Sequence, residues 1–204
     1  MRHVAIFLFN EIEVLDFAGP FEVFGVAGLR TAGLRSGERP FQVFTVAERG
    51  PVYARNGLSI NPTYLLNDHP KPDVLVIPGG GGVHPDGTPF GSRREVHNPV
   101  VINWILRHAP TAEIVLSVCT GAFLLAKAGL LDGLSATTHF KAEAGLQELA
   151  PNTTLAMHER WVDNGQMITS AGISAGIDAS LHVVGRLLGK EAADETAAYM
   201  QYER

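Results

Sequence analysis

The length, composition and charge of this chain exclude several classes of protein. Its 204 residues suit a single α/β domain spanning 1–204, and 46% of them are hydrophobic against 18% charged, an ordinary globular balance. The net charge of −5, without any Lys/Arg-rich stretch, argues against nucleic acid as a partner. No apolar run approaches the roughly 18 residues of a membrane helix. A single cysteine cannot close an intramolecular disulfide, which fits a reducing compartment, so we expect a cytoplasmic protein without a membrane partner.

Strand-like and helix-like segments alternate along the chain and predict a largely parallel sheet with helices on both faces. Gly19-Pro20 is expected in the first turn of the first helix, and 31–40 and 83–95 are expected to be loops. Strands are expected at 4–9, 41–47, 72–77, 112–118, 135–138, 153–156 and 160–170, with a hairpin at 52–60 that turns at Arg55-Asn56-Gly57. Helices are expected at 17–29, 98–108, 120–129, 140–149, 175–188 and 191–202.

Three segments are expected to meet at one edge of this sheet. In parallel α/β sheets, ligands bind at the carboxyl ends of the strands. The loop that ends at Asp16, the glycine run 79–82 and Cys119 each follow a predicted strand. Their convergence predicts a binding site there.

Cys119 is the candidate nucleophile. An apolar strand leads into it, and Thr120-Gly121 and a helical segment follow, a pattern similar to the strand-turn-helix that exposes a catalytic serine. The start of the following helix favours thiolate over thiol, and its free N–H groups can hold an oxyanion. The alternative is a buried cysteine that only fills core space.

Asp16 is the candidate proton carrier for Cys119. A carboxyl group beside a thiolate and away from water has a raised pKa, so it can exchange protons near neutral pH. The alternative role for Asp16 is to cap the helix that follows it. Glu13, in the same predicted loop, is a second candidate acid.

Other residues near the same edge have both functional and structural interpretations. The backbone of 79–82 permits close approach of a ligand, or forms only a flexible turn; it lacks the spacing of a nucleotide-binding loop. Thr120 offers an N–H and a hydroxyl, or simply starts a helix. His139 is either a general base or a capping residue. The eight scattered histidines form no metal-ligand pattern, and we expect neither a metal nor another cofactor.

The chain resembles the ThiJ/PfpI superfamily, which has a flavodoxin-like, three-layer fold of the class I glutamine amidotransferase type. The resemblance covers nearly the whole chain and is closest to the branch that contains isonitrile hydratase and the sensor domains of AraC-type regulators. It rests on LDFAGPFEV (15–23), VIPGG (76–80), SVCTGA (117–122), ATTH (136–139) and ITSAGISAGID (168–178).

The resemblance implies specific roles for residues of this chain. It implies Cys119 as nucleophile, Asp16 as an essential acid, Thr120 beside the nucleophile, Gly80 as a backbone donor, and a homodimer with the Asp16 region near the partner subunit. PfpI-type proteases have His where this chain has Thr120, and the human parkinsonism-linked relative has Glu where this chain has Asp16.

Two classes of function follow from these residues and the resemblance. The first is a hydratase in which Cys119 attacks a small electrophile, with an isocyanide giving an N-formamide. The second is a small-molecule or redox sensor that uses the same pocket without catalysis; because the sequence ends at Arg204, we expect no helix-turn-helix region with it. A hydrolase or lyase acting on another small substrate is a third interpretation of the same residues.

Overall fold

The computed structural model describes residues 1–28 and 39–203. Expectations for 29–38 lie outside the described residues. The helices are α1 (Val14–Val26), α2 (Ser92–Glu95), α3 (Pro99–His108), α4 (Ala122–Lys127), α5 (Glu143–Leu149), α6 (Ala175–Leu188) and α7 (Lys190–Tyr199). The strands are β1 (Arg2–Leu8), β2 (Phe41–Ala47), β3 (Val52–Tyr53), β4 (Ser59–Ile60), β5 (Tyr64–Leu65), β6 (Val74–Ile77), β7 (Gly81–Val83), β8 (Pro89–Gly91), β9 (Ile114–Val118), β10 (Ser135–Ala136), β11 (Thr154–Leu155), β12 (Trp161–Asp163) and β13 (Met167–Ser170).

The central sheet confirms the predicted α/β, flavodoxin-like class. In the described part of the chain it has seven strands in the order β12-β13-β9-β6-β1-β2-β5. All neighbours are parallel except β12 and β13, which form an antiparallel pair within the segment 160–170 that was predicted as a strand. β6 and β9 consist entirely of buried residues, as expected of parallel strands that are covered on both faces.

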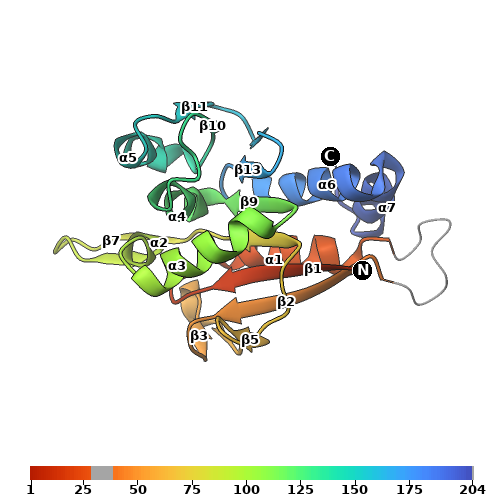
Figure 1. Ribbon diagram of the computed structural model, residues 1–204, viewed down its shortest axis with the longest axis horizontal. Coiled ribbons are helices and arrows are strands. Elements are labelled where there is room, and N and C mark those ends of the chain that lie inside the picture. The colour runs from red at the N-terminus through yellow and green to blue at the C-terminus, as the bar shows by residue number, and fades with distance from the viewer. Residues whose placement is uncertain (29–38, 204) are drawn as a thin grey trace.

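Helices cover both faces of the sheet. α1, α6 and α7 pack against one another on one face, while α3 contacts α4 on the other (Figure 1). Among the described residues, no helix combines the length and hydropathy that crossing a membrane would need.

The register of the sheet brings the carboxyl ends of β6 and β9 together. Ile77 at the end of β6 pairs with Ser117, two residues before Cys119. The glycine run therefore leaves the sheet beside Cys119. α1 follows the adjacent strand β1 and starts at the same edge.

The first helix begins earlier than expected. It starts at Val14, so Asp16 lies in its first turn rather than in a loop, and Pro20 lies inside the helix. The Glu13 carbonyl accepts the Asp16 N–H at 3.2 Å, which closes the first turn before the predicted start. The Gly19-Pro20 signal placed the helix start too late because Pro20 lies beyond the first turn of α1, where it removes a main-chain hydrogen bond without ending the helix.

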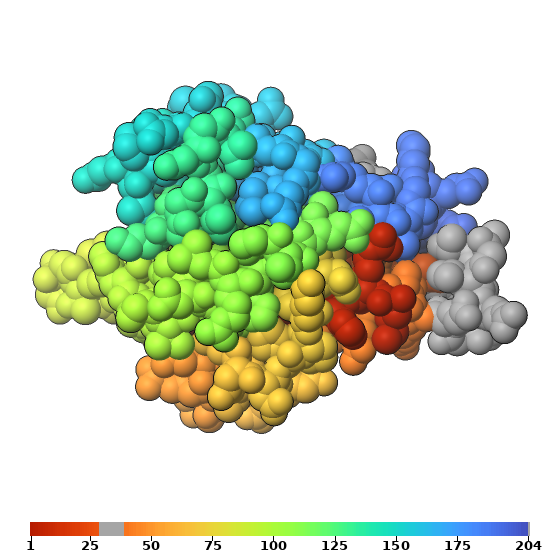
Figure 2. Space-filling view, viewed as in Figure 1, coloured from red at the N-terminus to blue at the C-terminus, as the bar shows by residue number. Residues whose placement is uncertain are grey.

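The segment predicted as a loop over 83–95 is partly regular. β7 and β8 pair as an antiparallel hairpin, and the short helix α2 follows at once. The hairpin projects from the body of the molecule, at the left of Figures 1 and 2. Its glycines and prolines concealed the pairing, because such composition usually marks loops.

Other predicted elements have close counterparts. The β3–β4 hairpin turns at Arg55–Gly57, where Asn56 and Gly57 take positive φ angles. The predicted helices that start near Thr120 and Phe140 each open with a short 3₁₀ turn before α4 and α5. The short edge strand β5 was not predicted, since two residues carry no periodicity.

Candidate active site

Cys119 lies on a sharp turn between β9 and α4. Its φ of 56° is left-handed, a conformation that costs a non-glycine residue energy and that recurs at functional sites. The turn is held on two sides: the Cys119 N–H donates to the Ala171 carbonyl at 3.3 Å, and the Thr138 hydroxyl donates to the Cys119 carbonyl at 2.8 Å. The predicted turn between a strand and a helix is therefore present, with Cys119 at the edge of the sheet.

Asp16 comes from α1 and is completely buried beside this turn. Its Oδ2 accepts the Gly79 N–H at 3.1 Å, and its carboxyl group interacts with the Cys119 thiol. Among the described residues, no N–H or hydroxyl binds the other oxygen, Oδ1. Asp16 does not cap α1, because Glu13 holds the N-cap position and makes no side-chain cap bond.

The Asp16 carboxyl has the raised pKa that the sequence predicted. Burial is the main cause and raises the pKa to about 7, with a smaller contribution from the nearby Glu13 carboxylate. Hydrogen bonds from Cys119 and Gly79 oppose this shift. Asp16 can therefore gain or lose a proton near neutral pH.

The predicted thiolate is wrong for the resting site. Burial raises the pKa of the Cys119 thiol above its ordinary value, and the negative charge of Asp16 raises it further. The Thr120 N–H and hydroxyl lower this pKa, but by less than burial raises it. The resting sulfur is therefore a thiol, and Asp16 is the neighbouring group that can accept its proton.

A buried hydroxyl network fixes Thr120. Its Oγ1 accepts the Gly80 N–H at 2.9 Å and the Ser92 hydroxyl at 2.8 Å. The Gly80 N–H assigned to substrate by the family resemblance is thus already engaged, and Gly80 acts here by holding Thr120. Ser92, which is fully buried at the start of α2, was missed because its segment was expected to be a loop.

Removing the Thr120 hydroxyl is expected to destabilise the protein. Thr120→Val leaves the Gly80 N–H and the Ser92 hydroxyl without an acceptor. Each buried unsatisfied donor costs about 1–3 kcal/mol, so we expect the free energy of unfolding to fall by about 2–6 kcal/mol in chemical denaturation. Thr120→Ser keeps the hydroxyl and is the matched control. Equal losses in both variants would contradict the network.

His139 lies close to Cys119 but is used as a cap. Its Nδ1 accepts the Lys141 N–H at 3.2 Å, and its ring stacks on Phe140. Burial lowers its pKa, so the ring is neutral near pH 7 and carries its proton on Nε2. The capping alternative is therefore confirmed, and the Nε2–H of this neutral ring is a donor rather than a base.

Gly172 leaves room for the side chains of His139 and Cys119. A Cβ atom at this position would lie 2.4 Å from His139 Cδ2 and 3.1 Å from Cys119 Sγ. Real Cβ atoms essentially never approach other atoms as closely as the first of these distances, so glycine at this position permits His139 and Cys119 to lie where they do.

The cavity that Cys119 faces has a volume of about 300 Å³, enough for a small molecule. Thr120, Gly80 and His139 line it together with the charged residues Glu13, Arg55, Arg93 and Lys141. Glu13, the second candidate acid, lies 3.7 Å from Arg55 in an ion pair. Within the described residues, no three His, Cys, Asp or Glu side chains are grouped as metal ligands.

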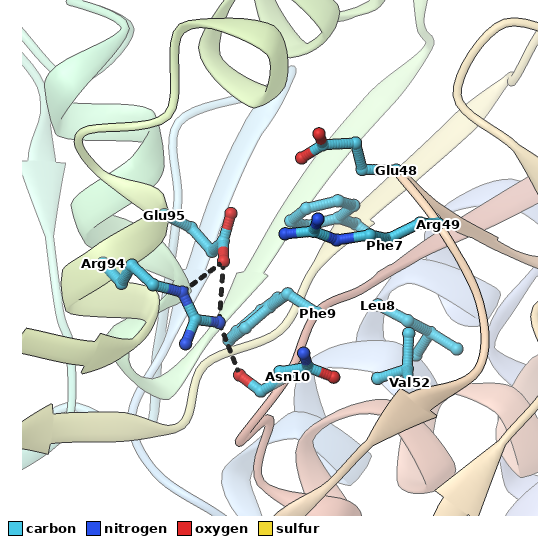
Figure 3. Close-up of a pocket in the computed structure, with 9 residues that line it drawn as sticks. All are labelled: Phe7, Leu8, Phe9, Asn10, Glu48, Arg49, Val52, Arg94 and Glu95. Atoms are coloured by element: carbon cyan, nitrogen blue, oxygen red, sulfur yellow. Dashed lines mark hydrogen bonds and ion pairs between the residues drawn. The ribbon is translucent and has the colours of Figure 1, made fainter.

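A separate hollow lies between the end of β1 and α2 (Figure 3). Arg94 enters it and binds both the Glu95 carboxylate and the Asn10 carbonyl. The described residues that line this hollow include no nucleophile, and Arg94 and Glu95 pair with each other, so the cavity at Cys119 is the candidate site.

The comparison with protein families matches residues 2–186 to the DJ-1/PfpI family. The chain belongs to the DJ-1/PfpI family. A solved DJ-1/PfpI relative, a ThiJ/PfpI protein from Pseudomonas syringae, is 26% identical with a TM-score of 0.82, over 100% of this chain and 76% of that one. Drosophila melanogaster DJ-1beta, with a TM-score of 0.78 and 22% identity over 100% of this chain and 99% of that one, shows the same fold.

The curated relatives include proteins with different functions. The isonitrile hydratase of Pseudomonas putida is 32% identical over 200 residues, which are 98% of this chain and 78% of that protein. The HTH-type transcriptional regulator GbdR of Pseudomonas aeruginosa is 31% identical over 180 residues, 88% of this chain but only 46% of the regulator. This chain therefore spans less than half of that regulator's length.

Proposed function

We propose that this DJ-1/PfpI protein is a hydratase that converts small isocyanides to N-formamides, with Cys119 as nucleophile. The observation that carries the proposal is the pairing of a thiol on a strained turn with a buried carboxyl whose pKa is about 7 and whose Oδ1 has no N–H or hydroxyl partner among the described residues. The similarity to isonitrile hydratase over nearly the whole chain supports it.

The first half-reaction forms a carbon–sulfur bond. The Asp16 carboxylate takes the thiol proton while the Cys119 sulfur attacks the terminal carbon of R–N≡C. The same proton then passes from Asp16 to that carbon, which gives the thioimidate R–N=CH–S–Cys. Asp16 ends this step as the carboxylate, ready to act as a base again.

The second half-reaction consumes one water. Asp16 removes a proton from water as the water oxygen adds to the thioimidate carbon, and Asp16 then passes this same proton to the nitrogen. The carbon–sulfur bond of R–NH–CH(OH)–S–Cys then breaks, sulfur recovers its proton through Asp16, and R–NH–CHO leaves. The net change is R–N≡C plus water to the formamide. The Thr120 N–H and the His139 Nε2–H are the donors available for developing charge.

A ligand sensor is the second candidate function. The observation that favours it is the match to a transcriptional regulator, which is 31% identical over 88% of this chain. A peroxide-responsive version is disfavoured, because the thiolate is the reactive form and burial raises the pKa of the Cys119 thiol.

Direct assay separates the two functions. Purified protein is mixed with a simple alkyl isocyanide, and formamide is followed by chromatography against a buffer blank. The hydratase produces formamide in amounts well above the protein concentration, and acid quenching during turnover reveals a covalent adduct on Cys119 by mass spectrometry. Saturable binding without formamide would instead favour the sensor.

A further inference from the structure

Arg93 is a cation beside the nucleophile that forms no ion pair within the described residues. Its guanidinium stacks on Phe123, with Cζ 3.4 Å from the ring centroid. Its Nη1 is shielded from solvent, and among the described residues it has no hydrogen-bond acceptor. Arg93 lines the Cys119 cavity and is close enough to feel the charge of a Cys119 thiolate.

The neighbouring residue, Arg94, differs from Arg93 because its guanidinium has hydrogen-bond acceptors. Arg94 donates hydrogen bonds to Glu95, to Glu11 and to the Asn10 carbonyl. Two of these acceptors, Asn10 and Glu95, are visible in Figure 3. Arg93 and Arg94 are adjacent in α2 and equally able to pair, so the difference between them comes from the place of Arg93 in the cavity.

The charge balance of the cavity also favours an anion. Arg55, Arg93 and Lys141 line it, and Glu13 is the single carboxylate among its described lining residues. Glu13 is already paired with Arg55 at 3.7 Å. Glu148, which lines the adjoining hollow with Arg93, is exposed and has no ion pair with it in the described structure. Within the described part of the chain, Arg93 therefore has no carboxylate to neutralise it.

We propose that Arg93 binds the carboxylate of the substrate, so that the substrates are small isocyanides that carry a carboxylate. This inference rests on the proposed function. Stacking on Phe123 covers a face of the guanidinium, and Nη1 on its edge has no acceptor among the described residues. A planar carboxylate would bind such an edge through two parallel hydrogen bonds. Arg93 is thus a specificity-determining residue, and the shared cavity keeps the distance between the carboxylate and the isocyanide carbon short.

The test compares 2-isocyanoacetate with the neutral 2-isocyanoacetamide. We expect the wild-type protein to prefer the acid, and Arg93→Met to lower kcat/KM for the acid by about 10- to 100-fold, as for loss of a charged hydrogen bond. The same variant should lower kcat/KM for the amide by much less, so that the ratio of the two values falls. Arg93→Lys should retain part of the preference. Arg107→Met removes an equal charge from the exposed end of α3 and is the matched control.

A binding measurement keeps this inference separate from the proposed function. Calorimetry with N-formylglycine and N-formylglycinamide tests the anion site in the absence of turnover. Hydration of both isocyanides without preference for the acid would overturn the inference and leave the hydratase standing. Binding of N-formylglycine that Arg93→Met abolishes, with no hydration of either isocyanide, would support the anion site and overturn the hydratase.

One further outcome would assign Arg93 to another role. If Arg93→Met changed the oligomeric state in size-exclusion chromatography and left the preference for the acid intact, a carboxylate of a second copy would be its partner, and the inference would be overturned. Thermal unfolding of each variant verifies that the loss of preference occurs in folded protein.

Discussion

Replacing Cys119 by alanine is expected to lower kcat/KM for isocyanide hydration by at least about 10⁴-fold, because removing a covalent nucleophile leaves only binding and oxyanion contacts. The measurement is formamide formation under initial-rate conditions. No adduct should form on the variant in acid-quenched mass spectra. Turnover close to that of the wild type would contradict a covalent role for Cys119 and with it the proposed mechanism.

Cys119→Gly provides the matched control for this variant. It also lacks the thiol, and glycine adopts the φ of 56° without the cost that alanine carries there. Both variants should be inactive, while Cys119→Gly should be the more stable by up to about 1 kcal/mol. This difference in unfolding free energy would show that the strain at the turn is independent of the chemistry at sulfur.

Asp16→Asn is expected to lower kcat/KM by about 10²- to 10⁴-fold, the usual contribution of a general acid–base. Asparagine keeps an oxygen that can accept the Gly79 N–H, so the geometry of the site is retained. In the wild type, the active form has Asp16 ionised, so kcat/KM should rise with pH and level off above the Asp16 pKa of about 7. The variant should lack this rise. An unchanged pH profile would mean that another group carries the proton.

Asp16 should also make the free energy of unfolding depend on pH. Its pKa is raised on folding, from an ordinary 3.8 to about 7, so the folded state holds its proton more tightly than the unfolded state. The stabilisation from this proton is complete below about pH 4 and is lost as pH rises to about pH 7, by on the order of 4 kcal/mol. Comparing unfolding free energies across this range, Asp16→Asn should lose less stability with rising pH than the wild type.

The pairing of Asp16 with Cys119 could be predicted because both follow strands of a parallel sheet. The order of elements places strand ends at one edge, and this rule needs no knowledge of side-chain packing. The ionisation of the pair could not be predicted in the same way. A helix start favours thiolate, but burial beside Asp16 outweighs it, and burial is a property of the assembled fold.

The contacts of Ser92 and Arg93 could not be predicted from the sequence for a different reason. Both lie in α2, directly after the β7–β8 hairpin, in a segment whose glycines and prolines resemble a loop. Nothing in the local pattern shows that Ser92 is buried against Thr120 or that Arg93 Nη1 lacks an acceptor among the described residues. Those properties depend on contacts between α2, the β6 end and the Cys119 turn.

The successive N–H groups of Gly79 and Gly80 bind Asp16 and Thr120 respectively. One peptide unit therefore sets the spacing between the proton carrier and the residue beside the nucleophile, since consecutive Cα atoms are fixed about 3.8 Å apart. The covalent backbone thus fixes the distance between the N–H group that binds Asp16 and the N–H group that binds Thr120. A residue inserted between Gly79 and Gly80 would misalign the two partners while leaving every reacting side chain in the sequence.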